Sequence, residues 1–149
     1  MTPARPPARP LASLCAATVL VGAGGVWAAA EGPQIVPGDG AMIPVPSGQE
    51  VTLQDVVWNV PGPEGLTLRF RFVAPAIAGT LGFEAAAEDM QYLCDTYALP
   101  RVADFGPQPA QIVISLSAAP LPFGEPAPDT EQFFESYSLA DGTCQWEMF

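Results

Sequence analysis

The sequence contains no histidine and no lysine, so that five arginines supply all of its fixed positive charge. Three of them, Arg69, Arg71 and Arg101, lie in residues 31–149 together with all 16 acidic residues, which leaves this part with a formal charge of −13. Nucleic acids and anionic lipids are bound through lysine and arginine, and we exclude both as partners. The charge is compatible with basic partners or with cations.

The absence of histidine and lysine also removes the groups that most often transfer protons or activate nucleophiles. Such work would fall to carboxylates or tyrosines, and no pair of these stands out in the sequence. The acidic residues Glu84, Glu88, Asp89 and Asp95 lack the spacing of a calcium loop and are interpreted as a solvated helix face. We predict a non-catalytic protein with no cofactor and no metal site, with a carboxylate-based hydrolase as a weaker alternative.

Residues 1–30 have the pattern of an export signal. Arg5 and Arg9 precede an apolar stretch over 11–26, and the small residues that follow predict cleavage between Ala30 and Glu31. The alternative is an uncleaved membrane anchor, because the apolar stretch is about long enough to span a bilayer. Cleavage predicts a periplasmic or secreted protein with no stable membrane insertion.

Residues 31–149 contain two cysteines, Cys94 and Cys144. In an oxidising compartment we predict that they form a disulfide between the apolar face of a helix and the apolar face of the last strand. The chain-entropy model gives roughly 4 kcal/mol for a loop of this size. The alternatives are free thiols, a metal pair with too few soft ligands, or a redox pair without the usual Cys-x-x-Cys spacing.

We predict a flexible, Pro/Gly-rich leader over residues 31–41 and a single α+β domain over 42–149. The clearest strand is 66–72, where leucine and phenylalanine alternate with threonine and arginine. Apolar residues at helical spacing predict a helix over 83–99 that Pro100 ends. The other predicted strands are 42–45, 51–58, 111–117, 133–139 and 143–149. The fold class follows as one mostly antiparallel sheet of about five or six strands with one helix packed on one face.

Arg69 and Arg71 project from the same face of the predicted strand 66–72. Two guanidinium groups at positions i and i+2 can clamp one anion, whereas the alternative is ion pairing with nearby acids such as Glu88 or Asp95. Trp58, a large aromatic residue close to a turn, is a further candidate for a binding patch, with core packing as its alternative.

Six segments resemble a family of small exported proteins of the Rhodobacter group of alphaproteobacteria that is classed as a domain of unknown function. They are LTLRFRFVAP (66–75), MQYLC (90–94), YALP (97–100), QIVISLS (111–117), PFGE (122–125) and CQWE (144–147). The resemblance implies a periplasmic setting and no mechanism. Some relatives are labelled acetolactate synthase, but 38–40 (GDG) matches only the start of a thiamine-diphosphate motif, and the required asparagine is missing.

These observations predict a periplasmic domain that binds a protein partner, such as another envelope protein, or assists envelope assembly. The alternative is a protein that binds a small anion or a cation. An exposed sheet surface without a pocket at Arg69 and Arg71 would favour the first function, and a concave pocket there would favour the second.

Overall fold

The structure is a computed structural model that describes residues 1–4, 6–8 and 32–148. The chain divides into two units, Met1–Ala30 and Glu31–Phe149. Most of the predicted export signal lies outside the described residues. The predicted cleavage site at Ala30 and Glu31 lies wholly outside them. Among the residues that are described, no helix is both long and apolar enough to cross a membrane.

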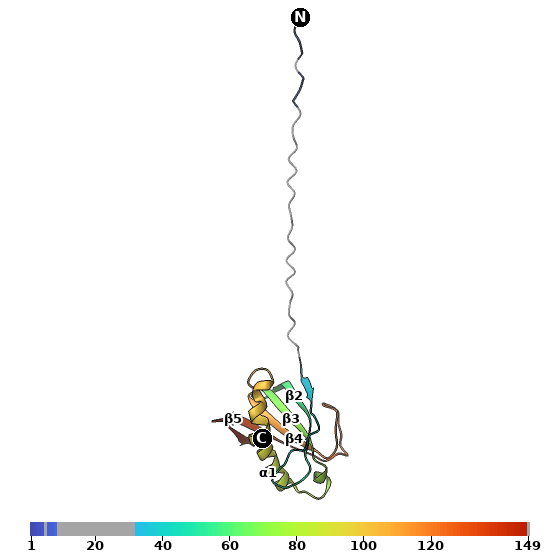
Figure 1. Cartoon of the computed structure of the whole chain (residues 1–149), viewed down its shortest axis with the longest axis vertical. Coiled ribbons are helices and arrows are strands. Elements are labelled where there is room, and N and C mark those ends of the chain that lie inside the picture. Colours follow the sequence, from blue (N-terminus) through green and yellow to red (C-terminus); the bar gives the residue numbers. More distant parts are fainter. Residues whose placement is uncertain (5, 9–31, 149) are drawn as a thin grey trace. The chain divides into compact units, whose positions relative to one another are not determined.

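The second unit contains one sheet of six strands, and the strands follow one another across the sheet in the order of the sequence (Figure 1). All neighbouring strands are antiparallel except β3 and β4, which are parallel. The predicted α+β class with a mostly antiparallel sheet is therefore confirmed. The strands are β1 (Gln34–Pro37), β2 (Thr52–Gly62), β3 (Gly65–Val73), β4 (Gln111–Ser117), β5 (Gln132–Ala140) and β6 (Thr143–Glu147).

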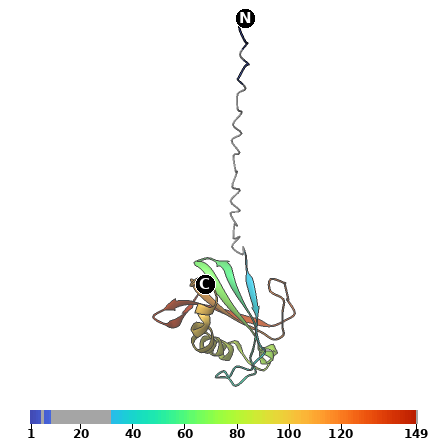
Figure 2. The ribbon, with the colours of Figure 1, turned by 45° about the horizontal axis from the view of Figure 1, so that its top comes forward.

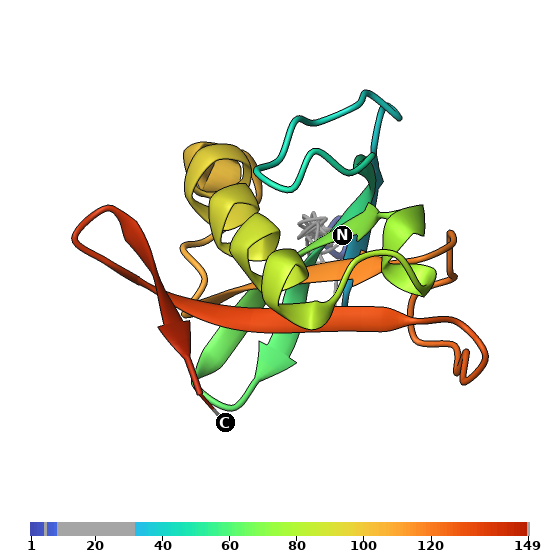
Figure 3. The ribbon, with the colours of Figure 1, turned by 90° about the horizontal axis from the view of Figure 1, so that it is seen from below.

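A helical crossover joins the two parallel strands, as parallel pairing requires. It consists of a short 3₁₀ helix η1 (Pro75–Ala78), the helix α1 (Phe83–Leu93), a π-helical turn η2 (Cys94–Ala98) and a second 3₁₀ helix η3 (Leu99–Asp104). Figure 3 shows α1 lying across one face of the sheet. This arrangement gives the sheet a covered face and an opposite face that carries polar side chains.

The core fills the space between α1 and the covered face of the sheet. Alternate residues of β3 and β4 point into it because side chains along a strand alternate between faces. The helix contributes residues at spacings of three and four, which lie on one side of α1. The central members are Leu68, Phe70, Phe72, Ile112, Ile114 and Leu116 from the strands, and Ala86, Met90, Leu93 and Cys94 from the helical segment.

The predicted disulfide between Cys94 and Cys144 is confirmed, with the two Cα atoms 6.1 Å apart. Two helical side chains also satisfy the outer backbone groups of β6 at this point. Asp95 Oδ1 accepts from the Cys144 N–H at 2.9 Å, and Gln91 Nε2 donates to the Cys144 carbonyl at 3.0 Å. The helix thereby covers part of a sheet edge that would otherwise offer unpaired backbone groups.

The helix prediction over 83–99 was right about the helix but wrong about its end. The α-helix ends at Leu93 and the chain continues through η2 and η3 as far as Asp104. Pro100 does not stop the chain from coiling, because it lies in the first turn of η3, where its missing N–H has no helical partner to lose.

The N-terminal strand lies elsewhere than predicted. Residues 42–45 form no strand; Met42 makes only an isolated bridge with Thr52. Instead β1, in the segment that we predicted to be a flexible leader, pairs with β2 at the edge of the sheet (Figure 2). Proline is tolerated at the end of an edge strand because no partner needs its N–H, so the proline content misled the prediction.

Candidate functional site

The polar face of the sheet carries two arginines side by side on β3, Arg69 and Arg71. Their neighbours on β2 differ, because the strand register pairs Arg71 with Asp55 and Arg69 with Val57. On the other side, β4 places Val113 next to Arg69. Paired residues share a face of the sheet, so Arg71 has a carboxylate beside it whereas Arg69 lies between two valines.

Arg71 is buried and fully engaged. Its Nη1 donates to both carboxylate oxygens of Asp55, at 3.1 and 2.9 Å, and its Nη2 donates to the Leu121 carbonyl. The predicted ion pairing with a nearby acid is confirmed for Arg71, but its partner is Asp55. Glu88 and Asp95 were wrong as partners, because both belong to the helical segment that covers the opposite face of the sheet. Arg71 therefore holds the 118–130 loop against the sheet.

Arg69 makes no hydrogen bond and no ion pair with any of the described residues, and its Nε is buried. Burial and then the adjacent Arg71 charge lower the pKa of the Arg69 guanidinium. The ring centre of Phe123 lies 5.9 Å from the Arg69 Cζ. A buried guanidinium donor without an acceptor destabilises the folded protein. A ligand that accepts a hydrogen bond from this donor would remove that cost.

The proline-rich loop over residues 118–130 forms a wall beside these arginines. It is anchored to β2 by Gln54, whose side chain donates to the Leu121 carbonyl at 2.6 Å and accepts from the Leu121 N–H at 3.1 Å. Between the loop and the sheet lies a cavity of about 360 Å³, here called the Arg69 pocket. Its lining includes Arg69, Arg71, Leu121, Phe123, Glu125 and Phe134.

A smaller cavity of about 180 Å³ adjoins the other side of Arg69, toward the β2–β3 turn. Its wall includes Thr67, Gln111 and Ser136 as well as Phe134. Arg69 and Phe134 are common to both cavities, so the guanidinium stands at the boundary between them. The lining of the two cavities includes Arg69, the ion-paired Arg71, several neutral hydrogen-bonding groups and aromatic side chains.

Trp58, the third residue predicted for a binding patch, is not part of this site. It neighbours Val57 on β2 and therefore points to the opposite face, where it packs against the core. Gly106 lies under its ring, and a Cβ on this glycine would come within 2.8 Å of the indole. The structure thus brings together Arg69 and Arg71 but assigns Trp58 to packing.

The model of a family described as a family of unknown function (DUF6497) matches residues 12–149. The chain belongs to this family. The predicted resemblance to an uncharacterised family is confirmed to that extent. No curated protein and no solved structure matches the chain.

Asp89 is a polar residue of this DUF6497 protein whose role the sequence did not indicate. Interpreted as solvated, it is instead fully buried on α1 and accepts three hydrogen bonds. The donors are the Ser47 N–H at 2.9 Å, the Ser47 hydroxyl at 2.5 Å and Gln49 Nε2 at 2.7 Å. The segment that contains Ser47 and Gln49 is teal in Figure 3 and lies beside the helix. Asp89 thus fixes the loop around Ser47.

The described residues contain no cluster of acidic or cysteine side chains that could hold a metal.

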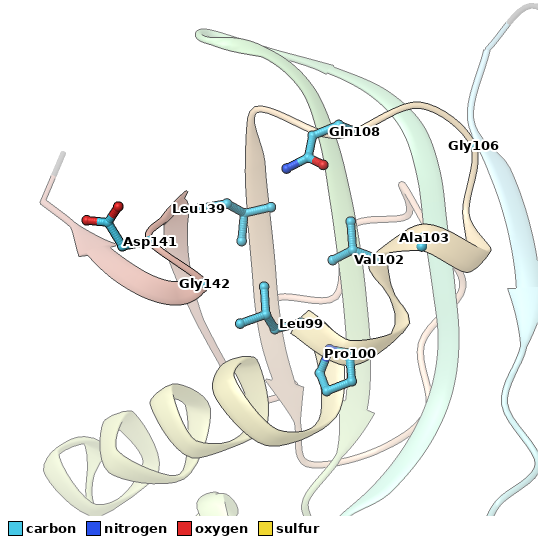
Figure 4. A pocket seen from close by; sticks show the side chains of 9 residues that line it. All are labelled: Leu99, Pro100, Val102, Ala103, Gly106, Gln108, Leu139, Asp141 and Gly142. Carbon is cyan, nitrogen blue, oxygen red and sulfur yellow. The ribbon is translucent and has the colours of Figure 1, made fainter.

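Another cavity, of about 630 Å³, lies between η3 and the β5–β6 turn (Figure 4). Figure 4 shows Leu99, Val102 and Leu139 pointing toward one another, with Asp141 on the hairpin turn at the rim. Its lining contains a single ionisable side chain, Asp141. With no partner for that carboxylate in the lining, we assign no chemistry to this cavity.

Proposed function

We propose that this DUF6497 protein is a non-catalytic binding protein of the periplasm that recognises an anionic group, most simply a carboxylate, in the Arg69 pocket. The observation that carries the proposal is the buried Arg69 Nε without a hydrogen-bond acceptor. The presence of a pocket at the two arginines favours ligand recognition over a flat protein-interaction surface.

A carboxylate suits this position for three physical reasons. A guanidinium presents its donors in a planar fork that matches the two oxygens of a carboxylate. The partly buried surroundings of Arg69 strengthen that attraction relative to bulk water. The ion pair would also relieve the cost of burying an uncompensated charge.

The walls of the pocket restrict the remainder of the ligand. Phe123, Phe134 and Leu121 provide apolar surface next to Arg69. The formal charge of −13 over residues 31–149 disfavours polyanions, because the domain as a whole repels them. A ligand with one negative charge and an apolar or aromatic body fits both conditions.

The lining also supports binding rather than hydrolysis. Glu125 is the only acidic residue among the lining residues of the Arg69 pocket, whereas carboxylate-based hydrolysis needs two acids that face one another. Glu125 makes no ion pair with Arg69 in the described structure and instead adds a competing negative charge to the pocket. We therefore expect Glu125 to weaken the binding of anions.

Titration with benzoate, acetate and inorganic phosphate, followed by NMR of the arginine Nε–H groups, tests the site. We expect benzoate to bind most tightly and to shift the Arg69 Nε–H signal. Arg69→Gln should abolish this binding, and Glu125→Gln should strengthen it. The matched control is Arg101→Gln, because Arg101 is an exposed arginine that interacts with Tyr97 far from the pocket. Equal binding by Arg69→Gln and wild type would refute the site.

The periplasmic location is tested separately. Osmotic-shock fractionation of cells that express the whole chain should release the protein with the periplasmic fraction. Intact mass measurement should then show a chain that begins at Glu31 and carries no free thiol. Recovery of an uncut chain with the cytoplasmic fraction would contradict the location without affecting the test of the Arg69 pocket.

A further inference from the structure

Two large aromatic side chains are exposed on either side of a second surface feature. Phe83 at the start of α1 is 49% exposed and Trp146 on β6 is 54% exposed. Between them lies a groove of about 330 Å³, here called the α1–β6 groove. Its lining is formed by Phe83, Ala87, Glu88, Gln91, Glu135, Tyr137 and Trp146.

Contacts within the protein hold the aromatic walls of the groove in place. The Phe83 ring packs edge-to-face against Phe133, with ring centres 5.3 Å apart. The Trp146 Nε1 donates a hydrogen bond to Glu135 Oε2 at 2.7 Å. The groove is thus preformed, and a partner would not have to order these rings when it binds.

The groove contains two acidic side chains, which come from different elements. Glu88 comes from α1 and Glu135 from β5, and the lining contains no lysine, arginine or histidine. A lysine or arginine side chain could lie with its apolar stem along the exposed rings of Phe83 and Trp146 and its charge near these carboxylates. The charge of the domain as a whole would also attract a basic partner.

We propose that the α1–β6 groove is the docking site for a segment of a partner protein that presents a lysine or arginine next to an apolar side chain. The groove is open to solvent and cannot enclose a small cation, whereas tight sites for small molecules bury most of the ligand. A second copy of this chain is a poor occupant, because residues 32–148 offer Arg101 as their only exposed arginine.

This site is independent of the proposed anion site. Glu135 pairs with Ile114, Tyr137 with Ile112 and Trp146 with Tyr137, so the strand residues of the groove lie on the face of the sheet that α1 covers. Arg69 projects from the opposite face. Loss of one activity should therefore leave the other unchanged, and Arg69→Gln should bind basic peptides as the wild type does.

The test uses protein expressed from the whole coding sequence and a short peptide in which lysine and leucine alternate. Fluorescence anisotropy of the labelled peptide gives the affinity, and NMR maps its position. We expect the largest shifts at the Trp146 Nε1–H and about a tenfold loss of affinity in Glu88→Gln/Glu135→Gln. The control Glu64→Gln/Glu131→Gln removes the same charge at exposed positions outside the groove and should change affinity less than about twofold.

Four results would overturn the proposal. The two double variants could lose affinity equally, which would indicate attraction by net charge alone. The NMR shifts could map away from Trp146, or free lysine amide could bind as tightly as the peptide. A matched peptide with glutamate in place of lysine should not bind, and binding of that peptide would also contradict the proposal.

Discussion

Arg71 on β3 donates to both carboxylate oxygens of Asp55 on β2, whereas Arg69, on the same face of the same strand, lies opposite Val57. One register thus gives two identical side chains different roles. Arg71 is neutralised and holds the loop carbonyl of Leu121. Arg69 is left with a buried donor and faces the cavity. The proposed recognition of an anion therefore depends on Arg69 having no carboxylate beside it.

Removal of Asp55 should strongly destabilise the protein. Asp55→Ala leaves the buried Arg71 guanidinium without its carboxylate, and we expect a loss of about 3 kcal/mol in the free energy of unfolding. Urea denaturation measures this change. The double variant Asp55→Ala/Arg71→Met should be more stable than the single variant, since it also removes the charge. A loss of less than about 1 kcal/mol for Asp55→Ala would contradict the structural role of the pair.

Arg69 should show the opposite behaviour. Arg69→Met removes an unsatisfied donor and a buried charge, and we expect the free energy of unfolding to rise by about 1 kcal/mol while anion binding is lost. Arg101→Met removes an exposed contact with the Tyr97 ring and should lower the free energy of unfolding slightly. If Arg69→Met is less stable than the wild type, the guanidinium has a structural partner and the recognition proposal loses its basis.

Asp89 should be essential for the loop around Ser47. Asp89→Ala leaves the Ser47 N–H, the Ser47 hydroxyl and the Gln49 amide without their acceptor, and we expect a loss of about 3 kcal/mol. Hydrogen exchange of the Ser47 amide should accelerate more than that of the strand amides. Glu88→Gln, at the exposed neighbouring position, should stay within about 0.5 kcal/mol of the wild type. Unchanged exchange at Ser47 in Asp89→Ala would argue against this role.

The disulfide should contribute a large part of the stability. We expect the variant Cys94→Ala/Cys144→Ala to lose about 2–5 kcal/mol in the free energy of unfolding. Denaturation with and without dithiothreitol provides the check: the reductant should lower the stability of the wild type and leave that of the variant unchanged. A reductant effect of the same size in both proteins would show that the disulfide is not its cause.

Tyr137 should make the fold sensitive to alkaline pH. Burial, and then the charges of Glu135 and Asp95, raise the pKa of its phenol above the ordinary value. The unfolded chain therefore releases this proton near pH 10 while the folded chain retains it. The stabilising effect is complete below that pH and is lost as the pH rises further. Urea midpoints at increasing pH should fall more steeply for the wild type than for Tyr137→Phe, and parallel curves would contradict the assignment.

Local periodicity accounts for the elements that were predicted correctly. The alternation in LTLRFRF (66–72) reflects one face against the core, and the helical spacing from Phe83 to Leu93 reflects one side of α1. The errors arose where a distant partner decides the structure. β1 is a strand because β2 pairs with it, although its local composition predicted a flexible leader. Residues 42–45 form no strand, although their local composition predicted one.

The sequence by itself determined the charge of the domain, the lack of histidine and lysine, the apolar pattern that selects an α+β fold, and the only cysteine pair available outside the N-terminal segment. These properties depend on composition and on neighbours along the chain. Only the tertiary structure decided that Asp55 meets Arg71, that valines flank Arg69 and that Asp89 is buried against Ser47. Such relationships depend on strand register and on the docking of distant segments, which local periodicity does not encode.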